Sequence, residues 1–156
     1  MKKLIIPALA LFLSAMTQAS ENPLWMRYCA ISPDGKMIVF TYKGDIYTVP
    51  TAGGKAAQLT TNPAHDTRPV WSPDGQQIAF ASNRNGNFDI FIMDKDGGVP
   101  RQLTSHSENE YPEAFTNDKH ILYQASIQQD AKDGQFPSFL FPQIYKVSAD
   151  GGRPEL

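Results

Sequence analysis

Hydrophobic and polar positions in this chain form short runs that are separated by turn-forming residues. Met37–Phe40 is a short run in which apolar side chains dominate, and Ile78–Phe80 is a second one. Each follows a Pro-Asp-Gly segment, in which Pro fixes φ, Asp bonds to its own backbone and Gly accepts a positive φ. Short apolar or alternating runs bounded in this way predict β-strands. The 12 Pro and 11 Gly of the sequence leave little room for long helices.

The same pattern of strands and turns occurs three times. Ser32–Gly35 recurs as Ser72–Gly75, and the two copies close with the same tripeptide at Gln58–Thr60 and Gln102–Thr104. A third copy is more divergent and contains a long insertion. Its matching segments are Thr116–Asp118, Ile121–Tyr123, Gln143–Tyr145 and Asp150–Gly152. Self-similarity at this period is typical of repeat architectures.

Each copy predicts four short antiparallel strands, so the fold class is all-β. Four-stranded units repeated every ~40 to 45 residues are typical of β-propeller blades. We expect about three four-stranded antiparallel blades, at about residues 27–66, 67–110 and 111–156, the last one unfinished. Closed propellers use roughly four to eight blades, so the ring is incomplete. We expect the start of a longer protein, with a six-bladed ring made of two copies as the alternative.

The first nineteen residues differ from the repeats. Lys2 and Lys3 precede the apolar stretch Leu4–Ala15, and small residues at Thr17 and Ala19 suit a signal peptidase. The sequence therefore predicts a signal peptide at residues 1–19 and an exported protein at 20–156. The stretch is short of the ~20 residues of a membrane span, so no span is expected after cleavage. An uncleaved anchor is the alternative.

Charge and cysteine content exclude several classes of function. Lys plus Arg number 14 and Asp plus Glu 16, with no basic run, so nucleic acid is not an expected partner. The single cysteine, Cys29, excludes an intramolecular disulfide and a cysteine zinc site. Asp94–Gly97 resembles a calcium loop only faintly and is better explained as a repeat turn. His65, His106 and His120 lack metal-ligand spacing. Taken together, these observations predict no metal, no cofactor and no catalytic residue in this sequence.

The repeat resembles a known propeller type. Trp71–Arg84, followed by Asp89–Phe91 and Asp96–Gly98, is similar to the repeat of TolB-type propellers. Together with Pro23–Tyr28, the insertion segment Ala125–Pro137 resembles the amino-terminal propeller of exported tricorn-like proteases from Gram-negative bacteria. This resemblance implies a periplasmic location and a parent enzyme with PDZ-like and serine peptidase domains of the C-terminal-processing type.

The resemblance also implies that this part of the parent is non-catalytic. It would guide or filter peptide or protein substrates, contact the downstream domains and support assembly of a homo-oligomer. Two alternatives stay open. One is a TolB-like periplasmic binding protein without enzyme activity, and the other is the propeller of a prolyl-oligopeptidase-type exopeptidase.

Strand parity places the variable loops at one end of the propeller. The second-to-third loops have two residues after Tyr42, six after Ser82 and seventeen after Ala125, and they share that end with the blade connections. Variable loops on a rigid scaffold are common sites of recognition. The candidate peptide or partner contacts are His65, Asp66, Arg84, Glu108, Phe136, Phe139 and Phe141. Alternatively, the three phenylalanines pack over a blade edge or a neighbouring domain.

Several residues have predicted structural roles. We expect Arg84 to pair with Asp89 across its loop and Cys29 to be a small buried residue of an innermost strand. The predicted blade-core side chains are Phe40, Trp71, Phe80 and Tyr123.

Overall fold

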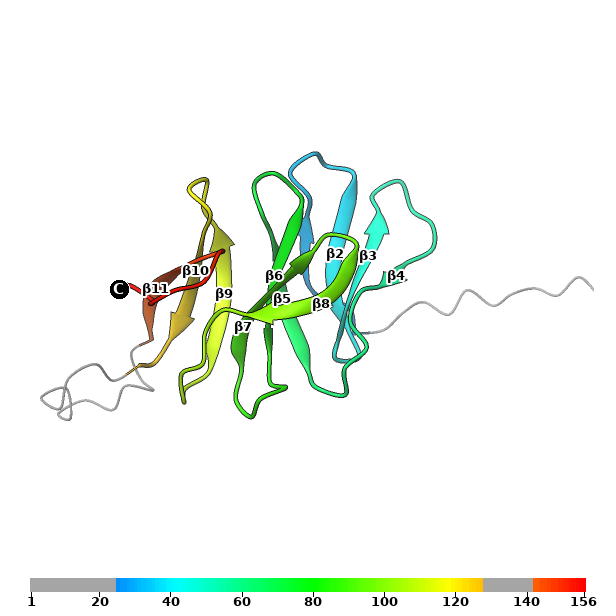
Figure 1. The fold of residues 1–156 in the computed structure, drawn as a ribbon. Helices are drawn as coiled ribbons and strands as arrows, with labels where there is room; N and C mark the ends of the chain where they lie inside the picture. The colour runs from blue at the N-terminus through cyan, green and yellow to red at the C-terminus, as the bar shows by residue number, and fades with distance from the viewer. Residues whose placement is uncertain (1–24, 128–141) are drawn as a thin grey trace, which may run out of the picture.

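The computed structural model describes residues 25–127 and 142–156, which form three antiparallel sheets (Figure 1). The strands of the first sheet are β1 Arg27–Ile31, β2 Met37–Tyr42, β3 Asp45–Pro50 and β4 Ala57–Gln58. Those of the second are β5 Asp66–Trp71, β6 Gln77–Ser82, β7 Asp89–Asp94 and β8 Gly97–Gln102. Those of the third are β9 Glu110–Phe115, β10 His120–Ala125 and β11 Gln143–Ser148. The predicted signal peptide and Phe136, Phe139 and Phe141 lie outside the described residues.

Each sheet is a meander in which consecutive strands pair, as the repeats predict. The third sheet has three strands instead of the expected four. Where a fourth strand would pair, the described chain has only an isolated bridge between Lys146 and Glu155. In the first sheet the fourth strand is only two residues long.

The turn between the first and second strands is built in the same way in each sheet. The Ser32 hydroxyl donates to Asp34 Oδ1 at 2.7 Å and accepts the Met37 N–H at 2.9 Å. Ser72 repeats both contacts at 2.6 and 2.9 Å. The Ser32 hydroxyl and the Lys36 backbone N–H, which both donate to Asp34 Oδ1, hold the pKa of the Asp34 carboxyl below its usual range. Because the polar groups of the turn are satisfied within it, the motif fixes the strand register locally.

The sheets pack face to face, with a separate hydrophobic core between each neighbouring pair. Between the first and second sheets, Val39 and Ile46 pack against Ile78 and Phe80. The corresponding core between the second and third sheets contains Tyr123. Strand β5 contacts both β1 and β9, so the first strands of the three sheets lie side by side. This arrangement is that of consecutive propeller blades, and we refer to the sheets as blades 1 to 3.

Three of the four predicted core aromatics, Phe40, Phe80 and Tyr123, are buried. Trp71 is only half-buried, and its indole N–H donates to the Ala30 carbonyl of blade 1 at 3.2 Å. The prediction that Cys29 is buried is wrong, because its side chain is exposed. Cys29 lies on β1, an edge strand of its sheet, and nothing in the described part of the chain covers its side chain.

The second-to-third loops of the first two sheets, residues 43–44 and 83–88, gather with the blade connections at one end, at the bottom of Figure 1. Backbone hydrogen bonds join them: Asp66 N–H donates to the Gly44 carbonyl, and Glu110 N–H donates to the Phe88 carbonyl, both at 2.7 Å. We call this the variable end. The Ser-Pro-Asp-Gly turns lie at the opposite end. Residues 25–127 and 142–156 contain no helix that is long and apolar enough to cross a membrane.

Candidate binding sites at the variable end

A basic and aromatic pocket of about 350 Å³ lies where the first strands approach the variable end. We call it the inner-edge pocket. It is assembled from all three blades, because the first strands of successive blades are neighbours. Its cations are Arg27, Lys43 and Arg68, and its rings are those of Trp25, Tyr28, His65, Phe88 and Tyr111. Its lining includes no carboxylate among the described residues, so it favours ligands that carry carboxylate or carbonyl oxygens.

Arg68 is the most constrained cation of the inner-edge pocket. Its guanidinium lies 5.3 Å from the ring centroid of Tyr28 and 4.5 Å from that of Tyr111. It also donates to Glu113 at 3.0 Å. The backbone of Arg68 has a φ of 51°, and Tyr28 has a φ of 53° at the equivalent position of β1. Such left-handed residues at strand irregularities aim side chains away from the regular pleat.

A buried ion pair lies within blade 2, beside the aromatic rings that face blade 1. Arg84 donates from Nη2 to both carboxylate oxygens of Asp66, at 3.0 and 3.1 Å, and from Nε to Ser82 Oγ at 2.9 Å. Its guanidinium also lies 4.5 Å from the ring centroid of Phe91. The Asp66 side chain is fully buried and that of Arg84 is 15% exposed. Asp66 is the first residue of β5 and lies opposite Ser82 of β6, so both members of the pair belong to blade 2.

The predicted pairing of Arg84 with Asp89 is wrong. The Asp89 carboxylate accepts hydrogen bonds from Asn87 at 3.3 Å and from Gln102 at 2.9 Å. Arg84 instead lies over the Phe80–Phe91 ring pair and reaches the start of β5. Asp66 lies opposite Ser82 in the pairing of β5 with β6, so the contact forms within blade 2, across the β5–β6 hairpin and outside the β6–β7 loop.

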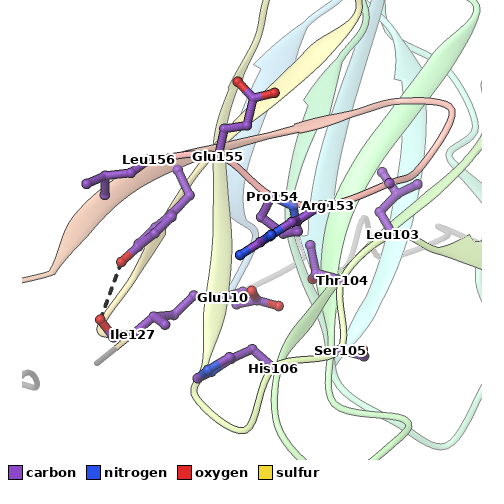
Figure 2. Close-up of a pocket in the computed structure, with 12 residues that line it drawn as sticks. Leu103, Thr104, Ser105, His106, Glu110, Ile127, Arg153, Pro154, Glu155 and Leu156 are labelled. Carbon is purple, nitrogen blue, oxygen red and sulfur yellow. Dashed lines mark hydrogen bonds between the residues drawn. The ribbon is translucent and has the colours of Figure 1, made fainter. Parts of the chain in front are cut away.

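A larger cavity of about 800 Å³ lies between blades 2 and 3 (Figure 2). Glu110, the first residue of β9, is fully buried in its wall. Within the described chain neither of its carboxylate oxygens has a hydrogen-bond partner. Burial raises the pKa of Glu110 to about 7, and the neighbouring Asp89 charge also raises it. The nearby Thr104 and Tyr123 hydroxyls and the His106 backbone act in the opposite direction. Burial also raises the pKa of the Tyr123 hydroxyl.

The candidate contacts predicted from the sequence fall in different places. His65 lines the inner-edge pocket, with its ring edge-on to Phe88 at 5.9 Å. Asp66 is fully buried in its pair with Arg84. Glu108 is exposed in the connection between β8 and β9. The direct roles of these residues in binding stay predictions.

Sequence reasoning missed Arg68, Tyr111 and Glu110. The first two are identified only once the first strands of different blades are brought together. Glu110 has a detectable signal, since it occupies the repeat position of Asp66, whereas Ile127 occupies that of Arg84. No group of three or more metal-binding side chains occurs in the described segments.

The three sheets, with neighbouring first strands and repeated Asp-containing turns, define a segment of a β-propeller. The family model of the tricorn protease N-terminal beta propeller domain matches residues 23–156. The chain therefore belongs to this family of propeller domains, and the resemblance inferred from its repeats is confirmed.

Several known proteins are similar to this chain in sequence or in structure. Uncharacterized protein Atu1656 of Agrobacterium fabrum is 33% identical over 133 residues, covering 80% of this chain and 41% of that protein. Tricorn protease homolog 1 of Streptomyces coelicolor is 29% identical over 82 residues, covering 53% and 8%. The chain thus spans less than half of either relative. The structure of putative TolB from Agrobacterium tumefaciens has the same fold, with a TM-score of 0.71 and 22% identity over 86% of this chain and 49% of that one.

Proposed function

We propose that this chain is a non-catalytic propeller segment of a periplasmic tricorn-like serine protease, where it binds and guides peptide substrates. Its family relates it to a protease, and propellers of this kind are rigid scaffolds for recognition. The parent protein would hydrolyse peptide bonds at a site in another domain. The exported location rests on the predicted signal peptide.

The inner-edge pocket is the observation that carries the peptide-guiding role. Extended peptides present carbonyl oxygens along their length and a carboxylate at one end, and both accept hydrogen bonds from arginine and lysine. The pocket combines three cations with exposed aromatic surface: Trp25 is 72% exposed and Tyr28 is 47% exposed. Aromatic and arginine side chains are the groups that contribute most to protein–peptide contacts.

A binding measurement tests this proposal. In the full-length protein that contains this chain, Lys43→Ala combined with Arg68→Gln removes two cations from the pocket. Because hydrogen bonds to charged groups contribute about 1.5–3 kcal/mol each, we expect at least about tenfold weaker binding of a labelled unstructured peptide. Fluorescence anisotropy measures the affinity. The control is Lys36→Ala, an exposed cation in a Ser-Pro-Asp-Gly turn at the opposite end, which should leave binding unchanged.

Two results would count against the pocket as the peptide site. One is unchanged affinity in the double variant, with circular dichroism showing it to be folded. The other is an equal loss of affinity in the Lys36→Ala control, because that would indicate a diffuse charge effect and no defined site.

A further inference from the structure

The two blade interfaces are built on the same frame. Asp66 and Glu110 each begin the first strand of a blade and donate a backbone hydrogen bond to the loop of the preceding blade. Thr60 and Thr104 are equivalent in the same way: each hydroxyl accepts a buried N–H, from Ile46 at 3.0 Å and from Ile90 at 2.9 Å. The carboxylates of Asp66 and Glu110 are therefore at equivalent positions of the two interfaces.

At the first interface the carboxylate has a cation. The guanidinium of Arg84 binds both oxygens of Asp66 and lies over the stacked rings of Phe80 and Phe91. The remaining cavity, which Arg84 lines, has a volume of about 400 Å³. The Asp66 carboxylate, the Ser82 hydroxyl and the faces of the two phenylalanine rings together form a site for the Arg84 guanidinium.

At the second interface the cation is missing from the equivalent position. The last paired residues before the second-to-third loop are Ser82 with Asp89 in blade 2 and Ala125 with Gln143 in blade 3. Arg84 lies two residues after Ser82, and Ile127 lies two residues after Ala125, so Ile127 takes the place of Arg84. Glu110 is fully buried, and within the described residues its oxygens have no hydrogen-bond partner. An isolated buried carboxylate is costly, so such groups are normally paired.

The other groups of a guanidinium site are present at the second interface. Tyr123 and Tyr145 replace Phe80 and Phe91 and stack with ring centroids 5.7 Å apart. The Tyr123 hydroxyl is buried and, in the part of the chain that is described, lacks a hydrogen-bond partner. It is an additional oxygen that can accept a hydrogen bond from a cation.

The cavity beside Glu110 is large enough to admit a side chain. Its volume of about 800 Å³ is twice that of the equivalent cavity at the first interface. Figure 2 shows Glu110, Thr104 and His106 around this space, with Arg153 also at its wall. Arg153 belongs to the segment after β11 and is exposed.

We propose that the cavity between blades 2 and 3 binds the guanidinium group of an arginine residue supplied by a peptide or a partner protein, with Glu110 as its counterion. Stacking on the tyrosine rings and hydrogen bonding to the Tyr123 hydroxyl orient the group, as Phe80, Phe91 and Ser82 orient Arg84. This site is separate from the inner-edge pocket, and its existence does not depend on peptide binding there.

The test uses the full-length protein and two matched probes, N-acetyl-arginine amide and its neutral citrulline analogue. We expect calorimetry to show the arginine probe binding at least about tenfold more tightly, because a charge-assisted pair is formed only with it. The Glu110→Gln variant should bind both probes equally weakly. The Ile127→Arg variant should bind neither, because its new guanidinium occupies the site as Arg84 does at the first interface.

Three results would overturn the proposal. They are equal affinity of the wild-type protein for the two probes, unchanged affinity in Glu110→Gln, and no binding of the arginine probe by the wild-type protein. If the wild-type protein does not bind the arginine probe, the Arg153→Ala variant shows whether Arg153 already fills the cavity. If binding appears only in that variant, the cavity holds the chain's own arginine and does not serve an external ligand.

Discussion

Replacement of Asp66 by asparagine is expected to destabilise the protein by about 3 kcal/mol, since breaking a buried ion pair leaves one charge without its partner. The guanidinium of Arg84 would keep its position over Phe80 and Phe91 but lose the carboxylate that it contacts with two hydrogen bonds. Both side chains lie almost entirely out of solvent, so water cannot replace that carboxylate.

Urea unfolding monitored by fluorescence measures this effect. Glu108→Gln is the matched control, because it also neutralises a carboxylate at the variable end but at an exposed position, where substitutions usually change stability by less than about 0.5 kcal/mol. A loss below about 1 kcal/mol for Asp66→Asn would mean that the ion pair contributes little to the stability of the folded protein.

Glu110→Gln, the repeat-equivalent substitution, is expected to have the opposite effect and to depend on pH. The folded protein raises the pKa of Glu110 from 4.5 to about 7, chiefly through burial. Between these pH values the folded state keeps a proton that the unfolded state releases, so stability falls as the pH rises through this window. Glutamine has no such penalty. At pH 8 the variant should be more stable by on the order of 3 kcal/mol, and near pH 4.5 the difference should vanish.

Thermal unfolding of both proteins across this pH range gives the comparison. Asp89 and His106 also face Glu110, but they are present in both proteins, so the difference isolates the Glu110 carboxyl. A destabilised Glu110→Gln variant at pH 8 would show that the charged Glu110 has a stabilising partner in the free protein. A difference that does not change with pH would show that folding does not raise the pKa of Glu110.

The repeat and the local turns could be predicted from the sequence. In Ser32–Gly35 and Ser72–Gly75 the side chains bond to their own backbone, so the structure of these turns is encoded in four residues. Two strands then follow each turn with little choice of register. The spacing of three such copies is enough to predict consecutive propeller blades.

Contacts between segments that are distant in the sequence could not be predicted in the same way. Arg84 has an acid across its own loop, Asp89, yet it pairs with Asp66, which the register of β5 on β6 places opposite Ser82. The inner-edge pocket likewise combines Tyr28, Arg68 and Tyr111 from three different blades. The position of Cys29 on an innermost strand predicts a buried side chain, but the side chain is exposed in the described structure.

The proposed function is tested most directly by the kinetics of the full-length protein on a long and a short substrate. The account predicts that Lys43→Ala with Arg68→Gln lowers kcat/KM for an unstructured peptide of about 20 residues by roughly tenfold or more. Cleavage of a short chromogenic peptide, which does not reach the propeller, should be unchanged. Equal effects on both substrates, or no effect on the long one, would contradict a guiding role, and absence of any peptidase activity in the full-length protein would contradict the proposed protease itself.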